Sequence, residues 1–271
     1  MAIDPTRFCI NRKIAPSLSI EQFFQLVHKL GLNKVELRND MRGGSVTDNL
    51  SYAEVKALAQ RYALEIVTIN AVYPFNQADA ALLAKTEGLL KDAQGVGAKA
   101  LVLCPLNDGT PVSDEETLAA LKTLAPLFAR YEVEGLVEPL GFTVSSLRSA
   151  VKAQTLIRDA KAPFRLVLDT FHHHLYEKAE AEFETGIDIN AIGLVHLSGV
   201  EDSRPTSELT DEERIMLTED DLLNTATQVQ RLERMGYRGV YAFEPFSSVM
   251  ENWKAEEIER EIRRSIALLQ D

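Results

Sequence analysis

Short apolar runs alternate with longer amphipathic stretches along the whole chain. Eight of the apolar runs hold mainly Val, Ile, Leu and Ala without strict polar alternation, which is typical of strands buried on both faces of a parallel sheet. They predict strands at residues 7–11, 34–38, 65–70, 100–104, 135–138, 164–169, 192–197 and 239–244.

The stretches between these runs have the spacing of helices. In the first, Ser19 is a suitable N-cap, apolar residues recur at helical intervals from Phe23 to Leu30, and Gly31 is a suitable end. Further helices are expected at residues 51–62, 79–96, 113–131, 144–159, 219–235 and 255–269, with a weaker, short helix around 175–183.

Eight strand–helix units in 271 residues predict an α/β fold, a single (β/α)8 TIM barrel whose one domain covers residues 1–271. The alternative is a doubly wound open sheet, which usually carries a glycine-rich phosphate-binding turn after its first strand. This sequence has no such turn there. Its Gly43-Gly44 pair follows the second strand and is expected in a loop.

Composition and charge restrict the kinds of molecule that this protein could bind and the compartment in which it could work. The formal net charge of −12 argues against nucleic acid, because an acidic surface repels the phosphate backbone. Two cysteines, Cys9 and Cys104, are too few for a disulfide framework and fit a reducing compartment. The N-terminus lacks a signal-peptide pattern, and no apolar run is long enough to span a membrane. We therefore expect a cytoplasmic protein without a membrane partner.

Four side chains suited to metal binding stand at the ends of the last four predicted strands: Glu138, Asp169, His196 and Glu244. The carboxyl ends of all barrel strands meet at one mouth, so these side chains are expected to converge. Any one of them alone would be interpreted as a solvated carboxylate or as a hydrogen-bonded structural histidine. Their recurrence on four consecutive strands favours a shared site.

Three carboxylates in one place repel each other unless a cation neutralises them. Together with one imidazole they form an oxygen-rich ligand set that suits Mn²⁺, Mg²⁺ or Co²⁺, with Zn²⁺ as an alternative. Neither cysteine ends a strand of this group, so we expect no thiolate ligand.

At these positions the sequence resembles the xylose isomerase-like barrel superfamily and, within it, the inosose isomerases, over nearly the whole chain. The most specific segments are residues 35–38 (VELR), 69–71 (INA), 166–172 (LVLDTFH), 195–197 (VHL) and 209–214 (LTDEER). The resemblance implies one divalent metal, with Mn²⁺ as the first choice, held by Glu138, Asp169, His196 and Glu244.

The resemblance also implies the chemistry. Glu138 and Glu244 would be the catalytic acid/base pair that moves a proton between neighbouring carbons of a polyol ketone through an enediolate. The reaction would convert 2-keto-myo-inositol to 1-keto-D-chiro-inositol in inositol catabolism. His172 and Arg214 would bind oxygens of this small-molecule substrate. Barrels of this family often pair, so a homodimer is compatible with the resemblance.

The sequence departs from the family pattern after Arg214, where residues 215–220 (IMLTED) replace the usual Pro-Gly-x-Gly turn. An inosose dehydratase and a ketose 3-epimerase on the same barrel remain alternatives, because both begin with the same proton abstraction. A repair phosphodiesterase, which uses many histidines, and a non-catalytic sugar-binding barrel are more distant alternatives.

The sequence also leads to expectations for a few other polar and aromatic residues. Arg12, after the first strand, is expected to point to solvent. Of the run from His172 to His174 only the first is assigned to the pocket, because successive residues point in different directions. His28 is expected to be structural, and Phe75 to line either the pocket or the core.

Overall fold

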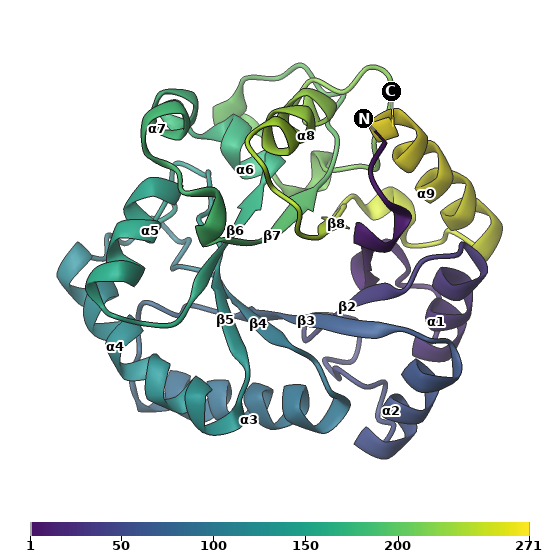
Figure 1. Cartoon of the computed structure of the whole chain (residues 1–271), viewed down its shortest axis with the longest axis horizontal. Helices are drawn as coiled ribbons and strands as arrows, with labels where there is room; N and C mark the ends of the chain where they lie inside the picture. Colours follow the sequence, from purple (N-terminus) through teal and green to yellow (C-terminus); the bar gives the residue numbers. More distant parts are fainter. Residues whose placement is uncertain (1, 271) are drawn as a thin grey trace.

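The computed structural model describes residues 2–270, in which eight parallel strands close into a barrel in chain order (Figure 1). The first strand pairs with the eighth as well as with the second, which confirms the barrel and excludes the open sheet. The strands are β1 (Phe8–Asn11), β2 (Lys34–Arg38), β3 (Glu65–Val72), β4 (Ala100–Leu103), β5 (Glu134–Val137), β6 (Arg165–Asp169), β7 (Ile192–Leu197) and β8 (Tyr241–Phe243).

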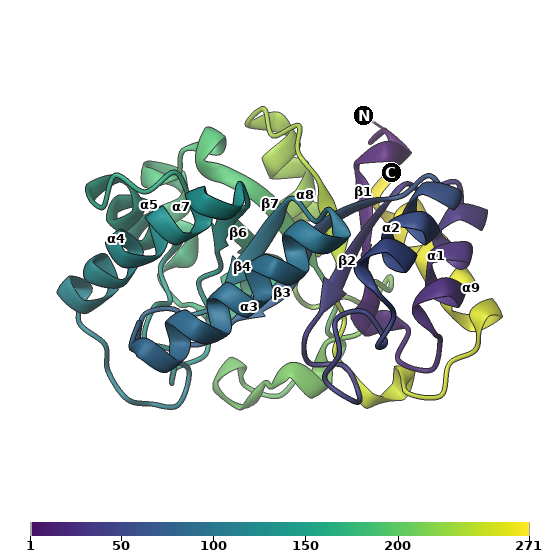
Figure 2. The same cartoon turned by 90° about the horizontal axis from the view of Figure 1, so that it is seen from below.

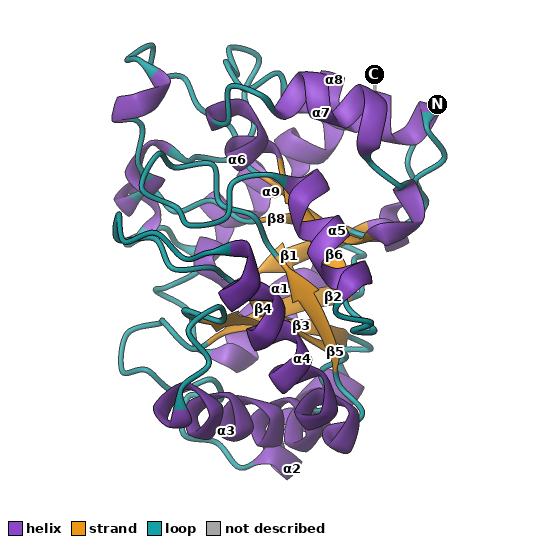
Figure 3. Cartoon of the chain, turned by 90° about the vertical axis from the view of Figure 1, so that its left-hand side faces the viewer, coloured by secondary structure: helices purple, strands orange, loops and turns teal. Residues whose placement is uncertain are grey.

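Helices surround this barrel on the outside, as Figures 1 and 3 show. They are α1 (Ile20–Lys29), α2 (Tyr52–Arg61), α3 (Ala80–Val96), α4 (Asp114–Tyr131), α5 (Ala150–Asp159), α6 (Thr170–Leu175), α7 (Ala179–Gly186), α8 (Thr225–Arg234) and α9 (Ala255–Gln270). Within residues 2–270, none of them combines the length and the apolar character that crossing a membrane requires.

Serine caps explain why several helices begin where the sequence predicts. The side chains of Ser19, Ser51 and Ser113 each accept the backbone N–H three residues later in a capping box, which satisfies amides that have no partner inside the helix. At the other end of α1, Gly31 has a φ of +75°, a conformation that costs glycine little.

Three helix predictions were wrong in their limits. The helix α5 begins at Ala150 rather than at residue 144, and Ser149 caps it. The helix α8 begins at Thr225 rather than at 219, because the Asp221 carboxylate accepts the backbone N–H groups of Val200, Leu223 and Thr225 and holds the chain before α8 as a loop. The weak helix around 175–183 is two helices, since α6 starts directly at the end of β6.

Two apolar layers support the barrel. Between the strands and the helices lies a large core that includes Phe75, which is fully buried, so the core interpretation of this residue is correct. A smaller cluster of eight residues from seven strands fills the inside. The strand β2 gives it no member: Val35 and Leu37 belong to the outer core, and by alternation Glu36 and Arg38 face inward. The interior of the barrel is therefore polar on the β2 side.

The two ends of the barrel differ. In Figure 2 the loops that follow the strands, among them the green segment near residue 210 and the yellow segment near residue 250, lie on one side, and both chain ends lie on the other. The loops form the mouth at the carboxyl ends of the strands, which is where barrels of this type place functional groups.

Candidate metal centre

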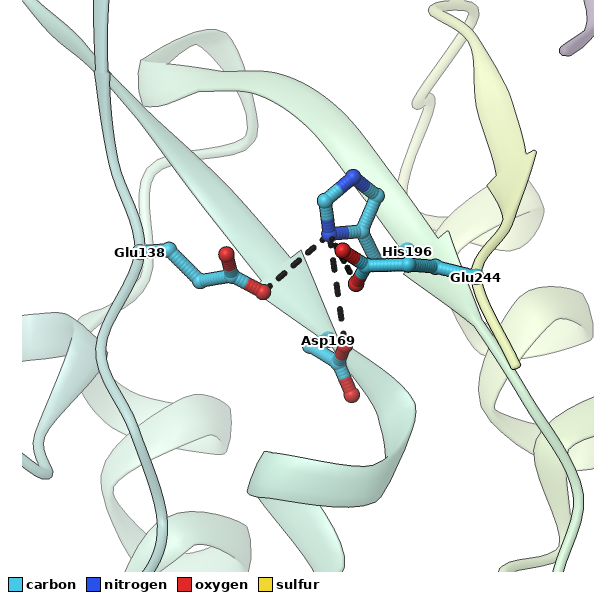
Figure 4. Close-up of side chains that lie close together, drawn as sticks. All are labelled: Glu138, Asp169, His196 and Glu244. Carbon is cyan, nitrogen blue, oxygen red and sulfur yellow. Dashed lines mark hydrogen bonds and ion pairs between the residues drawn. The ribbon is translucent and has the colours of Figure 1, made fainter. Parts of the chain in front are cut away.

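The four side chains at the ends of β5 to β8 meet at this mouth (Figure 4). One ligand atom from each of Glu138, Asp169, His196 and Glu244 lies within 4.8 Å of the others, and all four residues are buried. His196 Nδ1 is 3.1 Å from Glu138 Oε1, 2.9 Å from Glu244 Oε2 and 4.0 Å from Asp169 Oδ2. The imidazole nitrogen thus faces all three carboxylates.

The strand registers produce this convergence. Glu138 and Glu244 directly follow β5 and β8, and Asp169 is the last residue of β6. His196 pairs in register with Asp169 on one side and with Ala242 on the other. Asp169 also caps a helix, because its Oδ1 accepts the backbone N–H groups of Phe171 and His172 at the start of α6. This cap fixes one oxygen and leaves Oδ2 facing the cluster.

The protein itself balances part of the negative charge. Burial works against a charged His196, but the carboxylates of Glu244, Glu36 and Glu138 raise its pKa well above the usual value. Burial also raises the pKa of Glu138 to about 7. Burial acts to raise the pKa of Glu244 as well, but His196 and two arginines outweigh burial and lower the pKa of that carboxyl. The carboxylates thus favour a protonated His196, and burial favours a protonated Glu138.

The two arginines that flank Glu244 are Arg38 and Arg214, both almost fully buried. Arg38 Nη1 donates to Glu244 Oε1 at 2.7 Å, and Arg214 Nη2 lies 2.6 Å from Asp169 Oδ2 and 3.5 Å from Glu244 Oε2. Both guanidinium groups also stack on the ring of Phe246, at 5.0 and 4.6 Å. Glu244 is held firmly on both of its oxygens.

The donor set fits a divalent cation. It offers carboxylate oxygens from three residues and one imidazole nitrogen, all facing one point in a buried place. Such a set binds first-row transition metals or magnesium, and the residue types alone do not select one of them. The cluster could therefore hold one divalent metal ion.

A cavity of about 500 Å³ opens above the cluster. Its wall includes His172 and Arg214, the two residues predicted to bind substrate. His172 Nδ1 accepts the backbone N–H of Gly141 at 3.0 Å, which places the proton of the neutral ring on Nε2, and burial lowers the pKa of this histidine. The other lining residues are Arg38, Asn39, Asp40, Asn70, Ala71, Tyr73, Lys85, Cys104, Asn107, Glu138, Leu140, Phe142, Asp211, Glu244 and Phe246.

The remaining histidines lie apart from the cluster. His173 Nε2 is 2.9 Å from Glu180 of α7, and His28 Nδ1 is 2.9 Å from the backbone oxygen of Tyr62. These contacts are structural, as expected for both. His174 lines a separate surface hollow beside α8.

Sequence analysis missed several polar residues in and near the site. Arg12 is buried rather than exposed, because it forms an ion pair of 2.7 Å with Asp48. Cys104 lines the cavity, and its thiol lies 3.7 Å from Glu138 Oε2, so this cysteine does contact the cluster. Glu36 and Arg38 were noted only as part of a resemblance. Charged residues at inward positions of an apolar strand were the signal that could have found them.

Comparison with known proteins agrees with this architecture. A family model described as xylose isomerase-like TIM barrel matches residues 24–271. In sequence, no curated protein matches the chain. Among solved structures, a xylose isomerase domain containing protein from Salmonella typhimurium LT2 is similar over the full length of both chains, with 68% identity and a TM-score of 0.99.

More distant structures share the fold. The IolI protein, solved with a bound zinc atom, is 20% identical with a TM-score of 0.85, over 97% of this chain and 98% of that one. A D-psicose 3-epimerase is 15% identical with a TM-score of 0.64, over 98% and 100%. The match of the family model over most of the chain decides the assignment: this chain belongs to the xylose isomerase-like TIM barrel family.

Proposed function

We propose that this barrel is a metal-dependent isomerase of polyol ketones, converting 2-keto-myo-inositol to 1-keto-D-chiro-inositol. The observation that carries the proposal is the buried cluster of three carboxylates around His196 Nδ1, directly below a cavity that could hold a cyclic polyol. The similar IolI structure was solved with a bound zinc atom, which supports a divalent metal in this proposal.

The charge around the cavity favours a neutral substrate. The lining groups carry three positive charges (Arg38, Lys85 and Arg214) and four negative ones (Asp40, Glu138, Asp211 and Glu244), and Asp169 below them adds a fifth. A bound divalent cation offsets these two excess negative charges, and the buried Glu36 carboxylate behind His196 lies outside this sum. Both arginines already pair with carboxylates, so neither guanidinium offers its full charge to a phosphate or carboxylate group on the substrate.

The two glutamates divide the proton transfer in the proposed mechanism. A divalent metal would act as a Lewis acid that polarises the carbonyl and stabilises negative charge on its oxygen. Glu138 and Glu244 take the proton from the carbon that bears the hydroxyl group and return one to the former carbonyl carbon. Glu138 is the better candidate for the first step, because its partners are a thiol and His196, whereas two guanidinium groups hold Glu244.

His172 and Arg214 would orient the substrate. The proton on His172 Nε2 makes that atom a donor to a hydroxyl oxygen. Arg214 Nη1 pairs with Asp211 at the rim of the cavity, 3.2 Å away, and is the part of this guanidinium available to a substrate oxygen. Both side chains thereby fix the ring of the substrate rather than move protons.

Proton NMR in D2O tests the proposal most directly. The purified protein is supplied with Mn²⁺, Mg²⁺ or Zn²⁺ and 2-keto-myo-inositol, and paramagnetic metal is chelated before the spectrum is recorded. An isomeric ketone with deuterium beside the carbonyl is the expected product. Loss of water to a diketone would instead indicate a dehydratase, and inversion at one carbon an epimerase. An unchanged inosose with every metal would contradict the proposed substrate.

A further inference from the structure

Glu36 lies behind the proposed metal ligand, at the centre of strand β2. Its carboxylate is completely buried, and both of its oxygens are 3.0 Å from His196 Nε2, on the side of the ring opposite the three clustered carboxylates. Glu36 is not a member of the four-residue cluster. Burial of a charge in the barrel interior is costly unless it is paired and hydrogen-bonded, so its presence calls for a reason.

Donors surround this carboxylate. Thr68 Oγ1 and Asn70 Nδ2 donate to Oε2 at 2.5 and 2.9 Å, and Asn11 Nδ2 donates to Oε1 at 3.1 Å. All of these side chains come from the neighbouring strands β1 and β3. A site built only from donors stabilises the ionised carboxylate, which can then only accept a hydrogen bond from His196.

This acceptor determines which nitrogen of His196 carries hydrogen. Since Nε2 must donate to Glu36, the neutral imidazole keeps its free electron pair on Nδ1, the atom that faces Glu138, Asp169 and Glu244. The contact also fixes the ring orientation, because both oxygens of Glu36 lie at the same distance from Nε2.

The hydrogen bonds around Glu36 also extend to a second proposed ligand, Glu244. Asn11 Oδ1 accepts from Arg38 Nη1 at 3.2 Å, and that nitrogen also donates to Glu244 Oε1. Asn11 cannot rotate its amide without losing both contacts, because Nδ2 faces Glu36 and Oδ1 faces the guanidinium. Glu36 is thus linked directly to His196 and through Asn11 and Arg38 to Glu244.

We infer that Glu36 is a positioning residue that holds His196 as an Nδ1 ligand and thereby raises the affinity of the site for a divalent metal. The inference rests on the metal site of the proposed function and adds a residue to it. Outer partners of this kind typically change metal affinity by about 10- to 100-fold when they are removed.

The test compares metal affinity in matched variants by competition with a coloured chelator, using Zn²⁺ as the probe. Glu36→Gln keeps the shape but replaces an acceptor-only group by an amide, and we expect its dissociation constant for Zn²⁺ to rise by about 10- to 100-fold. Thr68→Val removes one donor to Glu36 but leaves its charge and its contact with His196, so its loss should stay below about tenfold. Equal affinity of wild type and a folded Glu36→Gln protein would overturn the inference.

A second measurement needs no variant. Long-range ¹H–¹⁵N NMR of the zinc-loaded wild-type protein should show the His196 ring protonated on Nε2. A proton on Nδ1 would overturn the inference even if Glu36→Gln failed to fold. If the wild-type protein binds no divalent metal, the proposed function falls as well, whereas equal affinities overturn only the role of Glu36.

Discussion

Glu138 and Glu244 have the same side chain and opposite surroundings. Arg38 and Arg214 contact both oxygens of Glu244, whereas the Cys104 thiol is the neighbour of Glu138 on the side away from His196. A carboxylate between two buried guanidinium groups is a poor proton acceptor, because its charged form is stabilised. The less constrained Glu138 is better suited to exchange a proton.

Replacement of Glu138 by glutamine tests this assignment. We expect kcat for deuterium incorporation into the inosose to fall by about 10²- to 10⁴-fold, the usual contribution of a general acid or base. Glu244→Gln should likewise abolish turnover, because each glutamate is a proposed ligand as well as an acid/base group. As a control, Glu134→Gln lies at the other end of β5 in an ion pair with Arg165 and should leave kcat unchanged. Near-normal kcat in metal-loaded Glu138→Gln would refute the assignment.

Arg214 supports the site as well as the substrate. It is 1% exposed and pairs with two clustered carboxylates, so Arg214→Ala leaves Asp169 and Glu244 without one of their buried cations. Breaking such a pair costs roughly 3–5 kcal/mol. We expect the melting temperature of the metal-free variant to drop, and added metal to restore part of it.

The comparison for Arg214 is Arg204→Ala, which removes an exposed arginine of the same loop that pairs with Asp202 and with Glu213. It should leave both melting temperature and KM nearly unchanged. If Arg214→Ala raised KM without any loss of stability, its role would be confined to the substrate, as the sequence alone suggested.

The proposed ligands were predictable because each stands at the end of a recognisable strand. The supporting residues were not, because their positions depend on which side of a strand faces inward. Arg12 shows why sequence reasoning fails for such residues. Most arginines are exposed, but this one is buried because it pairs with Asp48, which is distant in sequence. Pairings between separate loops leave little trace in the local pattern.

At the scale of elements, close contact between helix α6 and the loop after β5 positions His172. An added Cβ on Gly141 would lie 2.1 Å from the backbone oxygen of His172 and 2.9 Å from Leu175 Cβ. Gly141→Ala should therefore displace α6 from the loop after β5, destabilise the fold by about 1–3 kcal/mol and raise KM. Gly88→Ala is the matched control, since outside the local backbone of helix α3 nothing lies within 4 Å of its added Cβ. Equal melting temperatures and KM values for both variants would disprove this role of Gly141.

Another element-scale contact ties helix α8 to the start of β1 and β8. Arg7, just before β1, holds Glu233 of α8 through two hydrogen bonds of 3.1 and 2.6 Å, and Tyr241 of β8 donates to the same carboxylate at 2.8 Å. Burial opposes ionisation of this carboxyl, but these donors lower its pKa. The pair is partly exposed, so we expect Glu233→Gln to cost about 1–2 kcal/mol at neutral pH.

The pH dependence of this cost follows from the lowered pKa of Glu233. A carboxyl with a lower pKa in the folded protein stabilises it above the pKa of the unfolded chain, and the contribution disappears as pH falls through the folded value. The difference in unfolding free energy between wild type and Glu233→Gln should thus be constant near neutrality and shrink below about pH 4. Urea titrations at several pH values measure it, and a difference that grew on acidification would contradict the contact.

Most element limits follow from local chemistry that the sequence displays, such as the serine caps of α1, α2 and α4. The errors fall where an aspartate side chain holds the backbone just before a helix. Asp221 binds the N–H groups of Val200, Leu223 and Thr225 and delays α8, and Asp169 starts α6 without any loop. Both aspartates lie near the mouth, where functional loops interrupt the regular pattern.

At the scale of the whole molecule, the proposed metal site and the contact of Arg7 with Glu233 lie at opposite ends of the barrel. The proposed ligands and the cavity lie at the carboxyl ends of the strands, while the Arg7–Glu233–Tyr241 contact lies at their beginning. Eight strands in unbroken chain order made this division predictable, because strand direction alone places the ends of all strands at one mouth.

Metal binding at the mouth should stabilise the whole barrel. The cluster joins residues from four strands, and a ligand that binds only the folded chain adds about 2.7 kcal/mol at a hundred times its dissociation constant. For a chain of this size that corresponds to a rise in melting temperature of roughly 5–10 °C. Calorimetry of chelator-treated protein, titrated with Mn²⁺ or Zn²⁺, measures the shift, and a chelator should reverse it. Glu138→Gln is the control, because it removes one proposed ligand without unpairing an arginine. An equal shift in this variant would place the stabilising metal elsewhere on the molecule, since the four-residue cluster would then have no part in binding it.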